Sequence, residues 1–132
     1  MRLRGGQRYK EGVPIVPRVY ITGLGVVSSV GLGRAEFFKS LKEGRSGIST
    51  VSLFDATPLG RTMAGEVKAF RASDHLSAAE EKRMGRCSAM SLAAARMAVA
   101  ESGIKHAQLK GVRTAVVIGT TMGEADVIAD LD

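Results

Sequence analysis

Two glycines that follow a β-branched segment are the first candidates for a binding function. Gly23 and Gly25 come directly after residues 19–22, which read Val-Tyr-Ile-Thr. In dinucleotide-binding folds, glycines at such a position let the backbone approach a pyrophosphate at a helix N-terminus. The G-x-G-x-x-G fingerprint requires a third glycine where this chain has Ser28, and the next predicted helix begins only near Arg34. A nucleotide-binding, Rossmann-like domain is therefore an alternative hypothesis and not the leading one.

The chain has one cysteine and two histidines, the side chains that most often act as nucleophiles, proton carriers and metal ligands. Cys87 lies between Arg86 and Ser88 in the middle of a predicted helix, which favours an inert, at least partly buried thiol. His75 and His106 form no zinc-binding spacing with it, so we expect surface histidines, no metal and no cofactor. A single cysteine cannot form an internal disulfide, which is typical of a protein of the reducing cytoplasm.

Composition limits the remaining classes of function. With 132 residues, 45% apolar and 24% charged, the sequence predicts one soluble domain with one core, and no apolar stretch reaches the roughly 18–20 residues that span a bilayer. Of the formal charge of +6, the first 18 residues carry +4 and the rest of the chain carries +2. This predicts a basic, irregular extension over residues 1–17 and a domain over residues 18–132 that is nearly neutral. Of the six Phe and Tyr residues in the chain, only Tyr9, Phe38 and Phe70 directly adjoin a basic residue, which disfavours nucleic-acid binding.

Five segments have the periodicity of regular elements. In chain order they are a strand over residues 19–22, a helix over 34–43, a short strand over 63–67, a helix over 77–102 and a strand over 115–119. Gly44 and Gly103 follow the helices where left-handed caps are expected, and Ser77 with Glu80 forms a capping box. Strands that alternate with helices predict an α/β fold with a largely parallel sheet.

The helix predicted over residues 77–102 is rich in small side chains. Alanine recurs from Ala89 to Ala100, so the backbones of neighbouring elements can approach this helix closely, and we expect it to be buried. Gly85 lies inside the same predicted helix, where it should cost about 1 kcal/mol relative to alanine.

Residues 19–31 resemble the opening of the β-ketoacyl-acyl-carrier-protein synthases, which begin with V-x-I-T-G-L-G-x-V-S-x-x-G. Further matching segments follow in family order, at residues 41–48, 64–68, 82–84, 102–104 and 116–123, the last reading Val-Val-Ile-Gly-Thr-Thr-Met-Gly. The resemblance extends over residues 18–123. It implies the incomplete N-terminal part of a thiolase-like, layered α-β-α-β-α fold.

The resemblance also indicates where catalysis would occur. In this family a cysteine accepts the acyl group as a thioester, and two histidines support decarboxylation of the malonyl carrier protein. All three align beyond Asp132, and neither Cys87 nor the histidines match the family contexts, so we predict no catalytic residue in this chain. Met122 aligns with the apolar residue of a glycine loop that lines the acyl-chain pocket. The residues that would shape this loop with it are Gly119, Thr120, Thr121 and Gly123.

The resemblance therefore implies the front part of an acyltransferase that condenses an acyl thioester with malonyl carrier protein in fatty acid or polyketide biosynthesis. The full-length enzyme would work with acyl carrier protein as a homodimer, and the present chain alone would be inactive. A different class of function remains open, namely a non-catalytic subunit or split half that docks on a partner carrying the cysteine and histidines. An incomplete sheet also exposes strand edges, which predicts aggregation.

Overall fold

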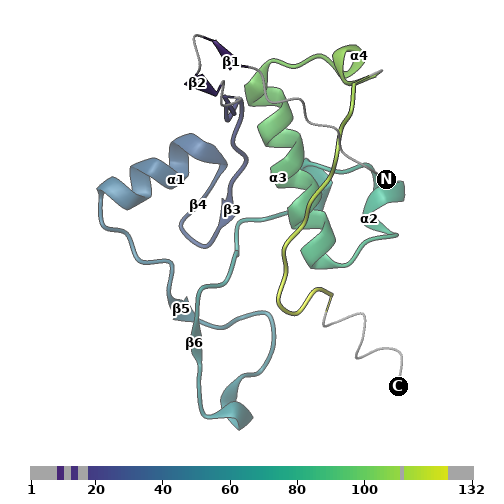
Figure 1. The fold of residues 1–132 in the computed structure, drawn as a ribbon. Helices are drawn as coiled ribbons and strands as arrows, with labels where there is room; N and C mark the ends of the chain where they lie inside the picture. Colours follow the sequence, from purple (N-terminus) through teal and green to yellow (C-terminus); the bar gives the residue numbers. More distant parts are fainter. Residues whose placement is uncertain (1–8, 11–12, 15–17, 111, 125–132) are drawn as a thin grey trace.

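The computed structural model describes residues 9–10, 13–14, 18–110 and 112–124 (Figure 1). Its helices are α1 (Gly33–Lys42), α2 (Ala78–Glu81), α3 (Arg86–Ser102) and α4 (His106–Leu109), with 3₁₀ turns η1 (Thr57–Leu59) and η2 (Ala72–Asp74). Two-residue strands pair antiparallel as β1 (Tyr9–Lys10) with β2 (Val13–Pro14), β3 (Val27–Ser28) with β4 (Gly31–Leu32), and β5 (Ser49–Thr50) with β6 (Met63–Ala64). The β5–β6 pair extends away from the helices (Figure 1).

Helix α1 follows the β3–β4 hairpin directly and lies within one residue of its predicted bounds. Its first turn is closed by the Glu36 carboxylate, which accepts a hydrogen bond of 3.0 Å from the Leu32 N–H. The buried Ser40 hydroxyl donates to the Val30 carbonyl at 2.7 Å and so fastens the helix to the hairpin turn. After the helix, Gly44 has a φ of +63°, which confirms the predicted left-handed cap.

The predicted continuous helix over residues 77–102 is wrong, because the chain forms two helices with a break between them. The capping box is confirmed: the Ser77 N–H donates to Glu80 at 2.8 Å and the Glu80 N–H donates back to the serine hydroxyl at 3.4 Å. Gly85 then adopts an extended conformation (φ −71°, ψ 172°) as the N-cap of α3. The predicted penalty for a glycine inside a helix therefore does not apply, because Gly85 precedes the helix.

A small hydrophobic core lies between α3 and the loop before α2. Phe70, Leu76, Ala89 and Ala93 are buried together, and Ala93 is fully inaccessible. The partly buried side chains that pack around them are Val27, Leu32, Val67, Ala72, Met90 and Leu92. The β3–β4 hairpin and α3 therefore share one core.

Gly23 and Gly25 pack against the alanine-rich face of α3. A Cβ atom at Gly25 would lie 1.7 Å from the Ala94 carbonyl oxygen, and one at Gly23 would lie 2.0 Å from that of Ala98. The Leu24 N–H donates to Glu101 at 2.7 Å between the two contacts. The close approach expected of this helix is confirmed, and the glycines meet helix carbonyl groups, which repel a phosphate. The nucleotide-binding hypothesis is therefore wrong about their role.

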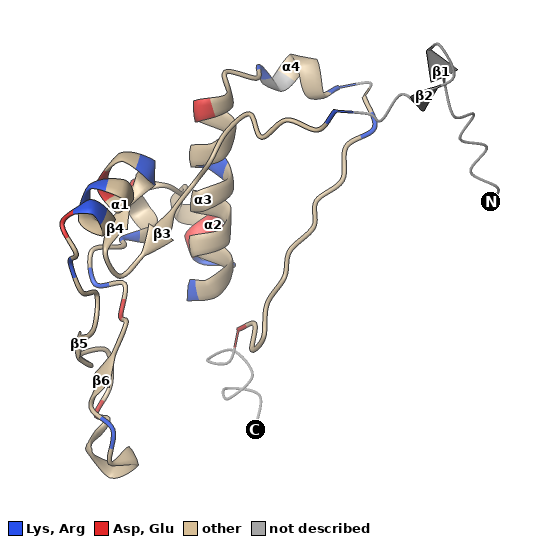
Figure 2. Ribbon diagram, turned by 60° about the vertical axis from the view of Figure 1, so that its left-hand side comes forward, with Lys and Arg blue, Asp and Glu red and all other residues tan. Residues whose placement is uncertain are grey.

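The predicted strands over residues 19–22 and 115–119 are wrong, as is the parallel sheet that they were to form. Both segments are extended, but within the described part of the chain neither belongs to a strand ladder. Val19 and Val117 are each 92% exposed, and Figure 2 shows both stretches free of charged residues. Their β-branched residues favour extended backbone, but the ladder hydrogen bonds must come from a neighbouring strand.

Exposed apolar segments of this kind predict self-association of the chain. Replacing Val117 by lysine should lower the aggregated fraction several-fold, because a charge on an unpaired edge opposes intermolecular strand pairing. Size-exclusion chromatography with light scattering measures the effect. The matched control is Leu59→Lys, which changes a 68% exposed residue outside both segments and should leave association unchanged. A monomeric wild-type chain at the same concentration would contradict the prediction.

No helix within the described residues is long and apolar enough to cross a bilayer. In the extension predicted over residues 1–17, the described residues form the β1–β2 pair, and the others lie outside the described part of the structure. The domain boundary at residue 18 stays a prediction.

Candidate functional site

The five residues of the predicted glycine loop form one turn at the end of the extended segment. Gly123 has a φ of +61°, a left-handed conformation that favours glycine, and its N–H donates to the Thr120 hydroxyl at 2.9 Å. Met122 is 73% exposed, and a Cβ atom added at Gly119 would meet no heavy atom within 4 Å. Contact between this loop and an acyl chain stays a prediction.

A carboxylate that the sequence did not single out connects this loop to α3. Glu124 accepts hydrogen bonds from the Cys87 N–H, at 3.1 Å, and from the Ser88 N–H. Hydrogen bonding from the Ser88 side chain, together with the two backbone bonds, holds the pKa of Glu124 below its ordinary value of 4.5 against a smaller opposing effect of burial. Glu124 is 37 positions from Cys87 and 36 positions from Ser88 in the sequence, so no local sequence pattern predicts the contact.

The nucleophile and ligand candidates are not brought together. Cys87 is free and partly buried, as predicted. The prediction that it lies in the middle of a helix is wrong, because the break before α3 places it in the first turn of that helix. His75 lies at the surface with intermediate exposure, and its ring stacks on Phe70 with centroids 5.7 Å apart. The side chain of His106 lies outside the described part of the structure. The described residues contain no group of three or more side chains that could hold a metal ion.

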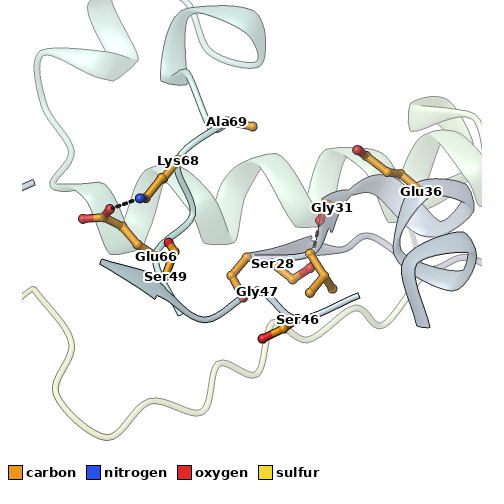
Figure 3. A pocket seen from close by; sticks show the side chains of 11 residues that line it. Ser28, Gly31, Glu36, Ser46, Gly47, Ser49, Glu66, Lys68 and Ala69 are labelled. Atoms are coloured by element: carbon orange, nitrogen blue, oxygen red, sulfur yellow. Dashed lines mark hydrogen bonds and ion pairs between the residues drawn. The ribbon is translucent and has the colours of Figure 1, made fainter. Parts of the chain in front are cut away.

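A hollow of about 240 Å³ lies between the β3–β4 hairpin and the β5–β6 pair (Figure 3). It is lined by Ser28, Ser29, Val30, Gly31, Glu36, Ser46, Gly47, Ser49, Glu66, Lys68 and Ala69. Small-molecule sites usually enclose about 300–1,000 Å³, so this space is small for a substrate. Its polar lining nevertheless places Glu66 and Lys68 side by side, 3.6 Å apart.

Glu66 has a structural role and is not suited to proton transfer. Its side chain is only 6% exposed and accepts hydrogen bonds from the Ser52 N–H and hydroxyl and from the Leu53 N–H, at 2.7–3.1 Å. These bonds, above all that of the Ser52 hydroxyl, lower the pKa of Glu66 to about 2 despite its burial. A carboxylate with this pKa is a weak base, which argues against a role in proton transfer at neutral pH. Its hydrogen bonds to Ser52 and Leu53 instead hold the loop after β5 in place.

Replacing Glu66 by glutamine should loosen the loop after β5 and reduce the sensitivity of this loop to acid. The pKa of Glu66 is lowered from 4.5 to about 2, so its stabilising effect is present above pH 4.5 and is lost as the pH falls toward 2. Hydrogen exchange of the Ser52 and Leu53 amides should accelerate at neutral pH in the variant. The control is Glu81→Gln on the exposed surface of α2. Equal acid sensitivity in wild type and Glu66→Gln would contradict this assignment.

Comparison with known proteins gives these observations a family context. The profile described as "Beta-ketoacyl synthase, N-terminal domain" matches residues 17–132. The chain is 34% identical over 113 residues to 3-oxoacyl-[acyl-carrier-protein] synthase 2 of Synechocystis, covering 86% of this chain and 27% of that protein. It is 37% identical over 106 residues to the tetracenomycin polyketide synthase ketoacyl synthase alpha subunit of Streptomyces glaucescens, covering 80% and 25% respectively.

A solved structure supports the same assignment. The ishigamide ketosynthase/chain length factor superposes with a TM-score of 0.73 and 40% identity, over 84% of this chain and 28% of that one. The chain thus spans about a quarter of the length of the relatives that it matches. The sequence resemblance and the α/β, thiolase-like fold class are both confirmed. This chain therefore belongs to the β-ketoacyl synthase family, within the N-terminal domain of these acyltransferases.

Proposed function

We propose that the protein containing this chain is a β-ketoacyl-acyl-carrier-protein synthase, to which residues 18–132 contribute the front of the catalytic domain. The observation that carries the proposal is the family match over residues 17–132. A relative named as a 3-oxoacyl-[acyl-carrier-protein] synthase and one named as a polyketide synthase subunit match about equally well, so the proposal covers fatty acid and polyketide biosynthesis alike.

The reaction divides its tasks between this chain and the remainder of the domain. A cysteine in the remainder takes the acyl group from its carrier protein as a thioester. Malonyl carrier protein then loses CO₂, and the resulting carbanion attacks the thioester carbonyl and releases the cysteine thiolate. The glycine loop of this chain contacts the acyl group, with Met122 limiting its length. In this division the chain alone is inactive, needs no cofactor and works in the cytoplasm with acyl carrier protein, as part of a homodimer.

The coding sequence that follows the codon for Asp132 tests this proposal most directly. If the protein is a synthase, we expect a segment Ala-Cys-x-x-Gly, in which x is a small residue, within about 45 residues of Asp132. This distance is the length of two helices, a strand and their connections. Histidines in His-Gly-Thr and Gly-His contexts should follow. If the continuing reading frame carries the domain without this cysteine, the catalytic assignment is wrong.

A non-catalytic subunit is the second candidate, and one comparison favours it. The solved structure with 40% identity is described as a ketosynthase/chain length factor, a pair of two named components. A continuing frame without the cysteine, next to a second frame that has it, would support a subunit that docks on a catalytic partner. Copurification of the two products would distinguish this arrangement from a homodimer.

Met122 gives the proposal a test at the level of product length. In the complete enzyme, Met122→Trp should shift products toward shorter acyl chains by at least one extension cycle, because the larger side chain fills the end of the pocket. Mass spectrometry of the carrier-protein-bound products measures the shift. The control is Met63→Trp, a 58% exposed residue of β6, which should leave the distribution unchanged. Unchanged products from an active Met122→Trp enzyme would remove the pocket role without affecting the proposed reaction.

A further inference from the structure

Helix α3 begins without a capping side chain of its own. Its N-cap is Gly85, which has an extended backbone and no side chain that could accept a hydrogen bond from the helix. The N–H groups in the first turn of a helix have no partner within the helix and need an acceptor from elsewhere. In α3 two of these donors are the N–H groups of Cys87 and Ser88.

Glu124 supplies the missing acceptor from a distant part of the chain. Each of its two carboxylate oxygens accepts a hydrogen bond from one of these N–H groups. Glu124 therefore caps the helix from a position distant in the sequence. A negative charge at this end also interacts favourably with the dipole of a helix that is 17 residues long. The contact is therefore stabilised both by hydrogen bonding and by charge.

The same contact fixes the position of the glycine loop. Gly123 and Glu124 are adjacent, and the tight turn from Thr120 to Gly123 transmits any movement of the carboxylate to Met122. The preceding apolar residues contribute little anchorage, since Val116 is 85% exposed and Ile118 is 69% exposed. Among the described residues, the hydrogen bonds that join residues 112–124 to the rest of the chain are those of Glu124.

We propose that Glu124 is a positioning residue for the glycine loop, which it docks on the N-terminus of α3 so that Met122 is held at a fixed place. The loop has acyl-chain selectivity only if the proposed synthase function is correct, whereas the docking contact itself does not depend on that function. Loss of the carboxylate releases the loop and removes the limit that Met122 sets, without removing any group that touches the reacting atoms.

The docking contact is tested first in the 132-residue chain. In Glu124→Ala, hydrogen exchange at the Cys87, Ser88 and Gly123 amides should accelerate about tenfold, as expected when a helix loses its cap. Glu124→Gln should recover part of the protection, because its amide oxygen still accepts a hydrogen bond. Cys87 is the only thiol of the chain, so its rate of alkylation gives a second readout and should rise in the alanine variant.

Several results separate this proposal from a general loss of structure. Circular dichroism should be unchanged in Glu124→Gln, and Glu81→Gln on α2 should affect neither exchange nor alkylation. Unchanged exchange in Glu124→Ala overturns the docking contact, whatever the protein does. In the complete enzyme, Glu124→Ala should broaden the product lengths, and Glu124→Gln should restore the narrower distribution in part. If hydrogen exchange shows that the loop is released in Glu124→Ala but the product lengths do not change, the positioning role is wrong. If the wild-type enzyme is inactive, only the proposed function is contradicted.

Discussion

Replacing Gly25 by alanine should destabilise the chain by about 3 kcal/mol, the upper end of what overpacking usually costs. The added methyl group would lie 1.7 Å from the Ala94 carbonyl oxygen, well inside van der Waals contact. The obstructing atom belongs to the helix backbone, so no side-chain rotation relieves the clash, and residues 18–26 must move away from α3. Urea denaturation followed by circular dichroism at low protein concentration measures the loss.

Gly119→Ala is the matched control for this substitution. A Cβ atom at Gly119 would meet nothing within 4 Å, so its effect on the free energy of unfolding should stay within about 0.5 kcal/mol. Leu24 also loses its hydrogen bond to Glu101 when the segment moves, and Glu101→Gln should therefore weaken the same contact more mildly. A Gly25→Ala chain as stable as wild type would show that the segment does not pack on α3 in solution.

Replacing Phe70 by alanine should have a comparable or larger effect, about 3–5 kcal/mol, because it empties the centre of a small core. Phe70 is 5% exposed and packs with Leu76, Ala89 and Ala93. Its ring also lies 5.7 Å from the Arg86 guanidinium carbon, so a cation–π contact is lost with it. Ordinary domains are stable by only about 5–15 kcal/mol, so we expect the variant to lose much of its helical signal at 25 °C.

Phe54→Ala removes the same side chain from a surface position and serves as the control. Phe54 is 59% exposed, and its replacement should change the unfolding free energy by no more than about 0.5 kcal/mol. Similar losses for the two phenylalanine variants would mean that the core described here does not determine the stability of the chain.

Local signals in the sequence predicted several helix ends, although not the break between α2 and α3. Ser77 and Glu80 are three positions apart and satisfy each other's backbone donors, so the capping box is visible without knowledge of the rest of the chain. Gly44 and Gly103 stop their helices because glycine adopts the left-handed conformation without steric cost. The alanine-rich stretch likewise predicted close backbone approach, although not that Gly23 and Gly25 would be the residues that approach it.

The remaining features depend on contacts between distant residues. Residues 19–22 and 115–119 have the composition of strands, but composition supplies no hydrogen-bonding partner. The prediction placed Gly85 inside a helix despite the cost of a glycine there, whereas the structure has it at a helix start. Next to this start, the Arg86 side chain donates a hydrogen bond of 2.6 Å to the Val67 carbonyl, a contact with a residue distant in sequence. In the candidate site, the family resemblance pointed to Met122, whereas Glu66 and Glu124 became visible only through their partners in space.

The contact between Leu24 and Glu101 also has a kinetic consequence. It joins residues 77 positions apart, so its formation must await closure of a long loop, whereas α3 forms through bonds between neighbours in sequence. We therefore expect α3 to form in an early folding phase, and the segment that contains Gly23 and Gly25 to dock on it in a later one. The uncharged, β-branched stretch before these glycines is accessible to solvent both before docking and after it, which makes it a candidate recognition element for chaperones during synthesis.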